Sequence, residues 1–212
     1  MVKAIIFDLD GVLIDSKEIH FNSLNLALSE VDKRFVISKA EQDGIFEGLT
    51  TKSKLKILTQ TRGLSEELHQ KIWLSKQKYS AAMFSSTSAD TELVSLFKVI
   101  KMNGIKIAVA SNSIRSTVDN CLSALGVLDY ADYTISNEDV TEPKPNPEIY
   151  IRCFSHFGIT PADAVVFEDS QIGIAAANSS KAKVVVVSSR KDLTFDKIVD
   201  NINYLLSSDK NV

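Results

Sequence analysis

Seven residues with polar or charged side chains follow short apolar runs or lie within a proline-rich segment, and they supply carboxylates, a hydroxyl, an amide and an amine. They are Asp8, Asp10, Ser111, Asn112, Lys144, Glu168 and Asp169. Carboxylates gathered in one place repel one another, and some stay protonated near neutral pH unless a cation lies among them. Carboxylate oxygens suit Mg²⁺, and an ammonium or a hydroxyl can hold phosphate oxygens. These residue types therefore predict a Mg²⁺ site for a phosphoryl group.

Asp8 and Asp10 are two residues apart at the end of the first apolar run, and Gly11 follows them. Residues two apart on a strand point to the same face, and a turn at Gly11 can move Asp10 outward. One carboxylate can attack phosphorus, while the other protonates the leaving oxygen and then activates water or another hydroxyl. An isolated Asp-x-Asp-Gly is usually only a turn, so this interpretation depends on the other polar positions.

Four continuous apolar runs, at residues 4–7, 107–110, 164–167 and 184–187, precede or separate these positions. Runs without alternation are typical of strands covered on both faces, as in a parallel sheet. Helical spacing recurs at Leu93, Leu96, Phe97 and Ile100; at Val118, Cys121, Leu122 and Leu125; at Tyr150, Cys153, Phe154 and Phe157; and at Phe195, Ile198, Val199 and Ile202. The alternation predicts an α/β fold with a doubly wound, Rossmann-like parallel sheet, whose ligands bind beyond the carboxyl ends of the strands.

The long segment after the first run does not follow this alternation and is too long for a loop. It shows two stripes with helical spacing: Phe21, Leu24, Leu28 and Val31, then Leu68, Ile72 and Tyr79. We therefore expect residues 15–84 to form a small α-helical cap, inserted into an α/β core of residues 1–14 and 85–212. Two connections to the core would permit hinge motion, so the cap could act as a lid.

The composition is that of a soluble globular protein. Of 212 residues, 44% are hydrophobic and 24% charged, and the net charge is −3. This mild acidity gives no overall attraction to nucleic acid or anionic membranes, so we expect neither as a partner. Cys121 and Cys153 fall among apolar helix positions and are expected to be core thiols. The apolar run at the N-terminus is too short for a signal peptide or membrane span. We expect a cytoplasmic monomer.

The order of these segments is similar to the four motifs of the haloacid dehalogenase superfamily of phosphotransferases. Residues 7–16 resemble its first motif, Ser111 the second, Lys144 in Lys-Pro-Asn-Pro-Glu-Ile-Tyr the third, and residues 168–170 with Gly173 the fourth. The helical insertion resembles the cap of the β-phosphoglucomutase and phosphoglycolate phosphatase branch. The dehalogenases of the superfamily lack the second aspartate, so Asp10 argues against halide chemistry.

The resemblance implies a role for each residue. Asp8 would be the nucleophile and Asp10 the general acid and base. Mg²⁺ would be bound by Asp8, the Asp10 backbone carbonyl and Asp169, with Glu168 at or near its water shell. Ser111, Asn112 and Lys144 would hold the phosphoryl group. The expected activity is that of a Mg²⁺-dependent phosphatase of a small phosphorylated metabolite, such as a sugar phosphate, acting through an aspartyl-phosphate.

The cap departs from the family at the position of a mutase arginine that binds a distal phosphate. Lys52 or Lys54 could serve there, although a lysine is a point charge rather than a bidentate fork. His20 matches a histidine of the mutase branch near the hinge and is expected to support the site. Residues 178–182 also lack the family's Ala-Gly turn, and a left-handed residue without glycine costs about 1 kcal/mol or more.

Two other functions remain open. A hexose-phosphate mutase would need the cap to exclude water, so that a sugar hydroxyl attacks the aspartyl-phosphate instead. A signalling domain that accepts a phosphoryl group without turnover would also place an aspartate beside Mg²⁺, a hydroxyl and a lysine. We favour it less, because the acidic pair here ends the first strand and a large helical insertion follows.

Overall fold

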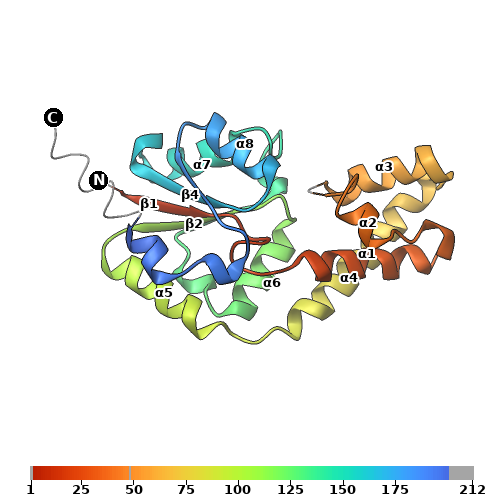
Figure 1. Ribbon diagram of the computed structural model, residues 1–212, viewed down its shortest axis with the longest axis horizontal. Helices are drawn as coiled ribbons and strands as arrows, with labels where there is room; N and C mark the ends of the chain where they lie inside the picture. The colour runs from red at the N-terminus through yellow and green to blue at the C-terminus, as the bar shows by residue number, and fades with distance from the viewer. Residues whose placement is uncertain (1, 48, 201–212) are drawn as a thin grey trace. The chain divides into compact units, whose positions relative to one another are not determined.

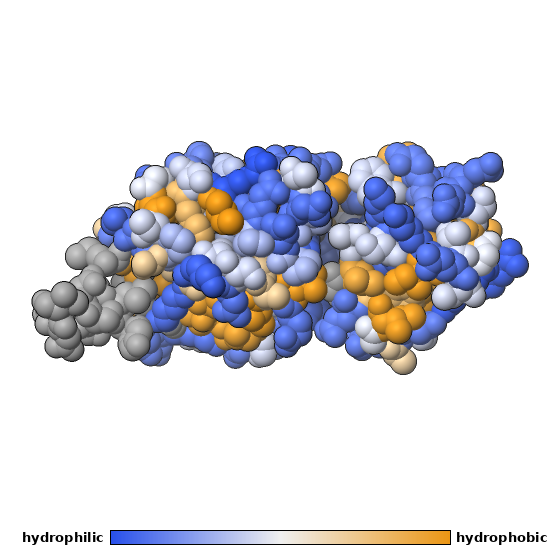
Figure 2. Space-filling view, turned by 90° about the horizontal axis from the view of Figure 1, so that it is seen from above, coloured by the Kyte–Doolittle hydropathy of each residue, from blue (hydrophilic) through white to orange (hydrophobic). Residues whose placement is uncertain are grey.

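The computed structural model describes residues 2–47 and 49–200. The chain forms two compact units, one made of Met1–Asp15 and Ser88–Val212 and the other of Ser16–Thr87. The smaller unit is thus an insertion between the first strand and the rest of the larger unit. No helix of the described ranges is long and apolar enough to cross a bilayer. On the face that Figure 2 shows, each unit is mostly hydrophilic with smaller apolar areas.

The larger unit is built on a parallel sheet whose strand order is β3-β2-β1-β4-β5. The strands are β1 (Ala4–Phe7), β2 (Lys106–Ala110), β3 (Tyr133–Ile135), β4 (Ala164–Glu168) and β5 (Lys183–Val186). The doubly wound α/β fold expected from the sequence is confirmed. The short edge strand β3 was not expected, because three residues are too few to show a pattern, although Tyr-Thr-Ile is rich in strand-forming types.

Helices cover both faces of this sheet, with α7 and α8 on one side and α5 and α6 on the other (Figure 1). They are α5 (Thr91–Met102), α6 (Arg115–Leu125), α7 (Glu148–Phe157) and α8 (Gln171–Ser179). Ile6, Ala108 and Val166 pack against α7 and α8. Across the sheet, Phe7 stacks on Phe97 and Phe167, with ring centroids 5.3 Å apart in each pair. Burial on both faces explains why the strands are continuously apolar.

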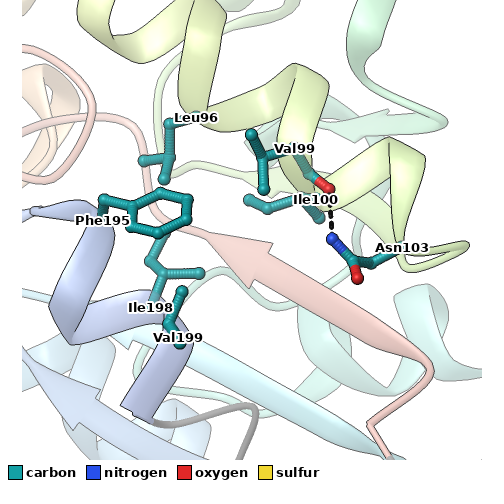
Figure 3. A pocket seen from close by; sticks show the side chains of 7 residues that line it. All are labelled: Leu96, Val99, Ile100, Asn103, Phe195, Ile198 and Val199. Atoms are coloured by element: carbon teal, nitrogen blue, oxygen red, sulfur yellow. Dashed lines mark hydrogen bonds between the residues drawn. The ribbon is translucent and has the colours of Figure 1, made fainter.

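The two cysteines are free and buried, as expected of core residues. Residues 195–200 are helical, in agreement with the spacing of the last apolar stripe, whereas Ile202 of that stripe lies outside the described residues. A small apolar pocket lies between this helix and α5 (Figure 3). It is lined by Leu96, Val99, Ile100, Asn103, Phe195, Ile198 and Val199, none of which is a candidate site residue.

The regular secondary structure of the smaller unit is entirely helical in its described residues. Its α-helices are α1 (Lys17–Ser29), α2 (Lys39–Gln42), α3 (Thr51–Arg62) and α4 (His69–Ser85). Leu24, Leu28 and Ile72, which belong to the two predicted stripes, lie in one apolar cluster with Phe35 and Phe46. A buried hydrogen bond of 2.8 Å joins Ser80 of α4 to Ser23 of α1. The cluster gives this unit a core of its own.

Candidate active site

The loop after β1 brings Asp8 and Asp10 to the carboxyl end of the sheet. The amide of Asp8 donates to the carbonyl of Phe167 at 2.9 Å, which extends the β1–β4 pairing by one residue. The chain then turns at Gly11, whose φ of 92° is left-handed. A Cβ at this position would also overlap the Asp169 carboxylate. Glycine is therefore required on both conformational and steric grounds.

Lys144 connects two buried carboxylates. Its Nζ lies 2.6 Å from Asp8 Oδ1, 2.6 Å from Glu168 Oε1 and 2.8 Å from the carbonyl of Ala110. The side chains of Lys144, Asp8 and Glu168 are 2%, 9% and 0% exposed. Because an ammonium has three N–H groups, these three acceptors use all of them. Lys144 is therefore a buried cation held in a fixed position rather than a solvent-exposed loop lysine.

Glu168 accepts hydrogen bonds from protein groups at both of its carboxylate oxygens. Besides Lys144, the Tyr150 hydroxyl donates to Oε1 at 2.5 Å. The amide of Asp169 and the hydroxyl of Ser170 donate to Oε2 at 3.2 and 3.3 Å. A Cβ on Gly173, in the first turn of α8, would overlap the Glu168 carboxylate. Sequence reasoning missed Tyr150, although it lies in the same motif as Lys144.

The charge balance of this cluster favours a further cation. Burial raises the pKa of Asp8 well above its usual value, and the neighbouring Glu168 charge adds to this effect, against the opposing attraction of Lys144. Burial acts to lower the pKa of Lys144, but attraction to Asp8 and Glu168 outweighs it and raises that pKa well above the usual value. Two buried carboxylates thus share one ammonium, and additional positive charge would stabilise their ionised forms.

The acidic residues can supply a set of oxygen ligands. Asp8, Glu168 and Asp169 each offer one carboxylate oxygen, and these atoms all lie within 4.8 Å of one another. Hard oxygen donors of this kind match the preference of Mg²⁺, which completes its shell with water and substrate phosphate. The chemistry of the donor set therefore fits the expected ion.

The loop between β2 and α6 provides the hydroxyl groups. Ser111 is buried, and its Oγ lies 3.4 Å from Asp10 Oδ2. Ser113, which sequence reasoning missed, donates to the same Asp10 oxygen at 2.8 Å. The Asn112 side chain instead binds the Lys144 backbone, accepting from its amide at 3.0 Å and donating to its carbonyl at 3.1 Å. The Asn112 side chain therefore holds the Lys144 loop in place.

The structure thus gathers the seven predicted residues of the larger unit at the carboxyl ends of β1, β2 and β4. The other two predicted residues, His20 and Lys52, belong to the smaller unit. Lys52 is exposed, whereas Lys54 and Lys76 are buried. Lys76 Nζ lies 3.3 Å from His20 Nδ1. Burial and repulsion by Lys76 lower the pKa of Lys54 to about 8, and its ammonium donates to the neutral Gln42 side chain at 2.9 Å.

The sequence matches the family of haloacid dehalogenase-like hydrolases over residues 5–187. The chain belongs to this family. It is 25% identical over 189 residues to the phosphorylated carbohydrates phosphatase of Thermotoga maritima, covering 84% of this chain and 82% of that protein. It is also 25% identical over 186 residues to the β-phosphoglucomutase of Bacillus subtilis, covering 84% of this chain and 80% of that protein.

A solved structure of β-phosphoglucomutase from Clostridium difficile has the same fold. Its TM-score is 0.81, with 24% identity over 98% of this chain and 100% of that one. The resemblance to the β-phosphoglucomutase and phosphoglycolate phosphatase branch is therefore confirmed, and the chain is an enzyme of this family. Since a phosphatase and a mutase are equally similar to it, identity alone does not separate these two activities.

Proposed function

We propose that this enzyme is a Mg²⁺-dependent phosphatase of a small phosphorylated metabolite such as a sugar phosphate, acting through an aspartyl-phosphate on Asp8. The observation that carries the proposal is the buried contact of Lys144 with Asp8 and Glu168, with Asp169 close enough to share a metal ion. A buried ammonium beside a nucleophilic carboxylate can hold an approaching phosphoryl group, which would otherwise be repelled by the carboxylate charge.

In the first chemical step an Asp8 oxygen forms a bond to phosphorus while the ester P–O bond breaks. The proton of the Asp10 carboxyl group passes to the departing oxygen, so that an alcohol leaves. In the second step the Asp10 carboxylate accepts a proton from water as the water oxygen bonds to phosphorus. The P–O bond to Asp8 then breaks, which releases phosphate and restores the Asp8 carboxylate and the protonated Asp10 carboxyl group.

The remaining residues hold the phosphoryl group during both steps. The Ser111 hydroxyl and the backbone amide of Asn112 would donate to its oxygens, and the Lys144 ammonium, whose N–H groups are already bound, would attract it through its positive charge. Asp8, Asp169 and the Asp10 carbonyl would bind Mg²⁺, with Glu168 near the water shell because its own oxygens already accept bonds from the protein. Bound there, the ion would offset the negative charge that the phosphoryl group brings beside the carboxylates.

Two buried lysines of the smaller unit favour a substrate with more than one anionic or polar group. Lys54 and Lys76 are buried cations of the same unit, and Lys54 has a lowered pKa. Bringing an anion to such a pair stabilises the charged ammonium, since an opposite charge nearby favours the ionised form. We therefore propose Lys54 and Lys76, rather than the exposed Lys52, as the cap residues that select substrate, with His20 supporting Lys76.

Phosphate release tests the main proposal. p-Nitrophenyl phosphate and a panel of sugar phosphates are incubated with the enzyme, with Mg²⁺ and then with excess chelator. We expect turnover that needs Mg²⁺ and is abolished in Asp8→Asn. Activity that survives chelation, or that persists in Asp8→Asn, would show that a different centre is at work.

The β-phosphoglucomutase relative makes a hexose-phosphate mutase the second candidate. A buried cation pair that can hold a distal phosphate is also what a mutase requires, because its intermediate carries two phosphates. Incubation of β-glucose 1-phosphate with a bisphosphate activator separates the two activities. Glucose 6-phosphate without free phosphate would favour the mutase, and stoichiometric release of phosphate would favour the phosphatase.

A further inference from the structure

Ser113 contacts the side chain to which the proposed mechanism assigns both proton transfers. Its hydroxyl donates to Asp10 Oδ2 at 2.8 Å, whereas Ser111 Oγ is 3.4 Å from the same atom. The shorter distance is typical of a good O–H···O bond, and the longer one is at the limit. Ser113 is therefore the closer hydroxyl partner of Asp10 in this loop.

The backbone around Ser113 is fixed independently of this contact. Its amide donates to Ser111 Oγ at 2.9 Å, and its carbonyl accepts from the amide of Asn137 at 3.1 Å. The Asn137 side chain also donates to the carbonyl of Asn112 at 2.8 Å. Because these bonds involve the Ser113 backbone or its neighbours, the loop holds the hydroxyl at a defined place and would keep its course without it.

Asp10 has a different local setting from Asp8. Asp8 lies at the end of β1 and is held by buried Lys144, whereas Asp10 lies in the turn one residue before Gly11 and is partly exposed. A carboxylate in a turn can rotate about its side-chain bonds, yet a proton donor must lie within hydrogen-bond reach of the departing oxygen. A fixed hydrogen bond to one carboxylate oxygen restricts that rotation.

We propose that Ser113 is a positioning residue that orients Asp10 for proton transfer. The inference rests on the proposed phosphatase mechanism and extends it. The Ser113 hydroxyl holds Oδ2, and Oδ1 carries the proton that passes to the ester oxygen as the ester P–O bond breaks. Loss of the hydroxyl would impair the protonation of the leaving group without removing a group that binds phosphate.

The basicity of the leaving group distinguishes a loss of proton donation from a general structural defect, because only the former depends on the leaving group. p-Nitrophenolate is a weak base and departs with little need for a proton, whereas phenolate is a stronger base and benefits from general acid catalysis. Phenyl phosphate and p-nitrophenyl phosphate have nearly the same shape. Their kcat/KM values report the steps up to phenol release, and therefore the phosphorylation of Asp8.

The experiment compares Ser113→Ala, Ser113→Thr and the unaltered enzyme on both substrates. We expect Ser113→Ala to lower kcat/KM for phenyl phosphate by about tenfold or more, in the range seen for groups that orient a catalytic residue. Its kcat/KM for p-nitrophenyl phosphate should stay close to that of the unaltered enzyme. Ser113→Thr keeps a hydroxyl and should restore phenyl phosphate turnover. Ser116→Ala, an exposed serine three residues further on in α6, is the matched control.

An equal loss on both substrates would assign Ser113 a merely structural role, and no loss on either would remove it from the mechanism. Asp10→Asn serves as the reference, because removing the acid itself should affect phenyl phosphate far more than p-nitrophenyl phosphate. If the unaltered enzyme hydrolyses neither substrate, the proposed phosphatase activity fails. If it hydrolyses both and Ser113→Ala changes neither value, the proposed activity stands and the inference alone is wrong.

Discussion

Buried lysines of two kinds occur in this enzyme, and their partners decide how each one titrates. Lys144 contacts the carboxylates Asp8 and Glu168, which raise its pKa. Lys54 donates to the neutral oxygen of Gln42 and is repelled by Lys76. Desolvation disfavours the charged form of both, but only Lys144 has anions that compensate for it. The same side chain therefore remains an ammonium in one setting and loses its proton near pH 8 in the other.

At the residue scale, we predict that Lys54 titrates near pH 8 and that Lys76→Met raises this value. The folded pKa of about 8 lies below the ordinary 10.5, so the unfolded chain binds more protons between these values. This group therefore makes the fold less stable below pH 8, and its penalty disappears as the pH rises from 8 to 10.5.

The titration can be followed by ¹³C NMR of the lysine Cε signals, with Lys54→Arg to assign the signal. An unshifted Lys54 pKa near 10.5 would contradict the prediction. So would a Lys76→Met protein in which the Lys54 value did not rise. The second measurement separates the repulsion by Lys76 from the effect of burial.

At the scale of elements, the parallel order of β1, β2 and β4 places their carboxyl ends side by side. Asp8, Ser111 and Glu168 each stand at one of these ends, and Lys144 reaches them from the loop that precedes α7.

The connection between α8 and β5 contains a residue with strained backbone. Between α8 and β5 the backbone at Lys181 is left-handed, with a φ of 69°. This is the conformation expected where the family has a glycine.

We predict that Lys181→Gly stabilises the enzyme by about 0.5–1 kcal/mol. A left-handed residue with a Cβ costs about 1–2 kcal/mol, and glycine recovers this cost less its own larger loss of chain entropy. Urea denaturation measures the change in the free energy of unfolding. Lys181→Ala removes the long side chain but keeps the Cβ, so it should show no comparable gain. If the alanine variant gains as much as the glycine variant, backbone strain is not the cause.

At the scale of the whole molecule, the chain leaves the larger unit after Asp15 and returns to it at Ser88. The acidic centre therefore lies in one unit, and the buried cations Lys54 and Lys76 lie in the other. Each unit has its own apolar core, so substitutions at the surface of the helical insertion can leave the packing of the sheet unchanged.

We predict that Mg²⁺ raises the thermal stability of the enzyme in the absence of substrate. A ligand that binds only the folded state adds about 2.7 kcal/mol when present at one hundred times its dissociation constant. The melting temperature is measured with MgCl₂ and with NaCl at equal ionic strength. Asp169→Asn should abolish the increase, because it removes one of the three clustered carboxylates. An equal increase in Asp169→Asn would place the bound ion elsewhere.

Helices α3 and α8 were not predicted from the sequence, which by itself determined four of the five strands, the helices α1, α4, α5, α6 and α7, the helical insertion after the first strand, and which polar residues follow the strands. These follow from periodicity and from residue type, both of which are local properties. The pair Asp8 and Asp10, which follows the first apolar run, is likewise visible without a structure. The edge strand β3 escaped because three residues carry too little periodicity.

Only the tertiary structure decided which atoms meet. The contact of Ser113 with Asp10 spans 103 positions of the chain, and that of Lys144 with Asp8 spans 136. Such contacts depend on strand order, loop course and side-chain rotamers, and no local pattern encodes these together. The same reason explains why Lys54, rather than Lys52, is the buried lysine of α3: a shift of two residues changes the face of a helix, and only packing shows which face is covered.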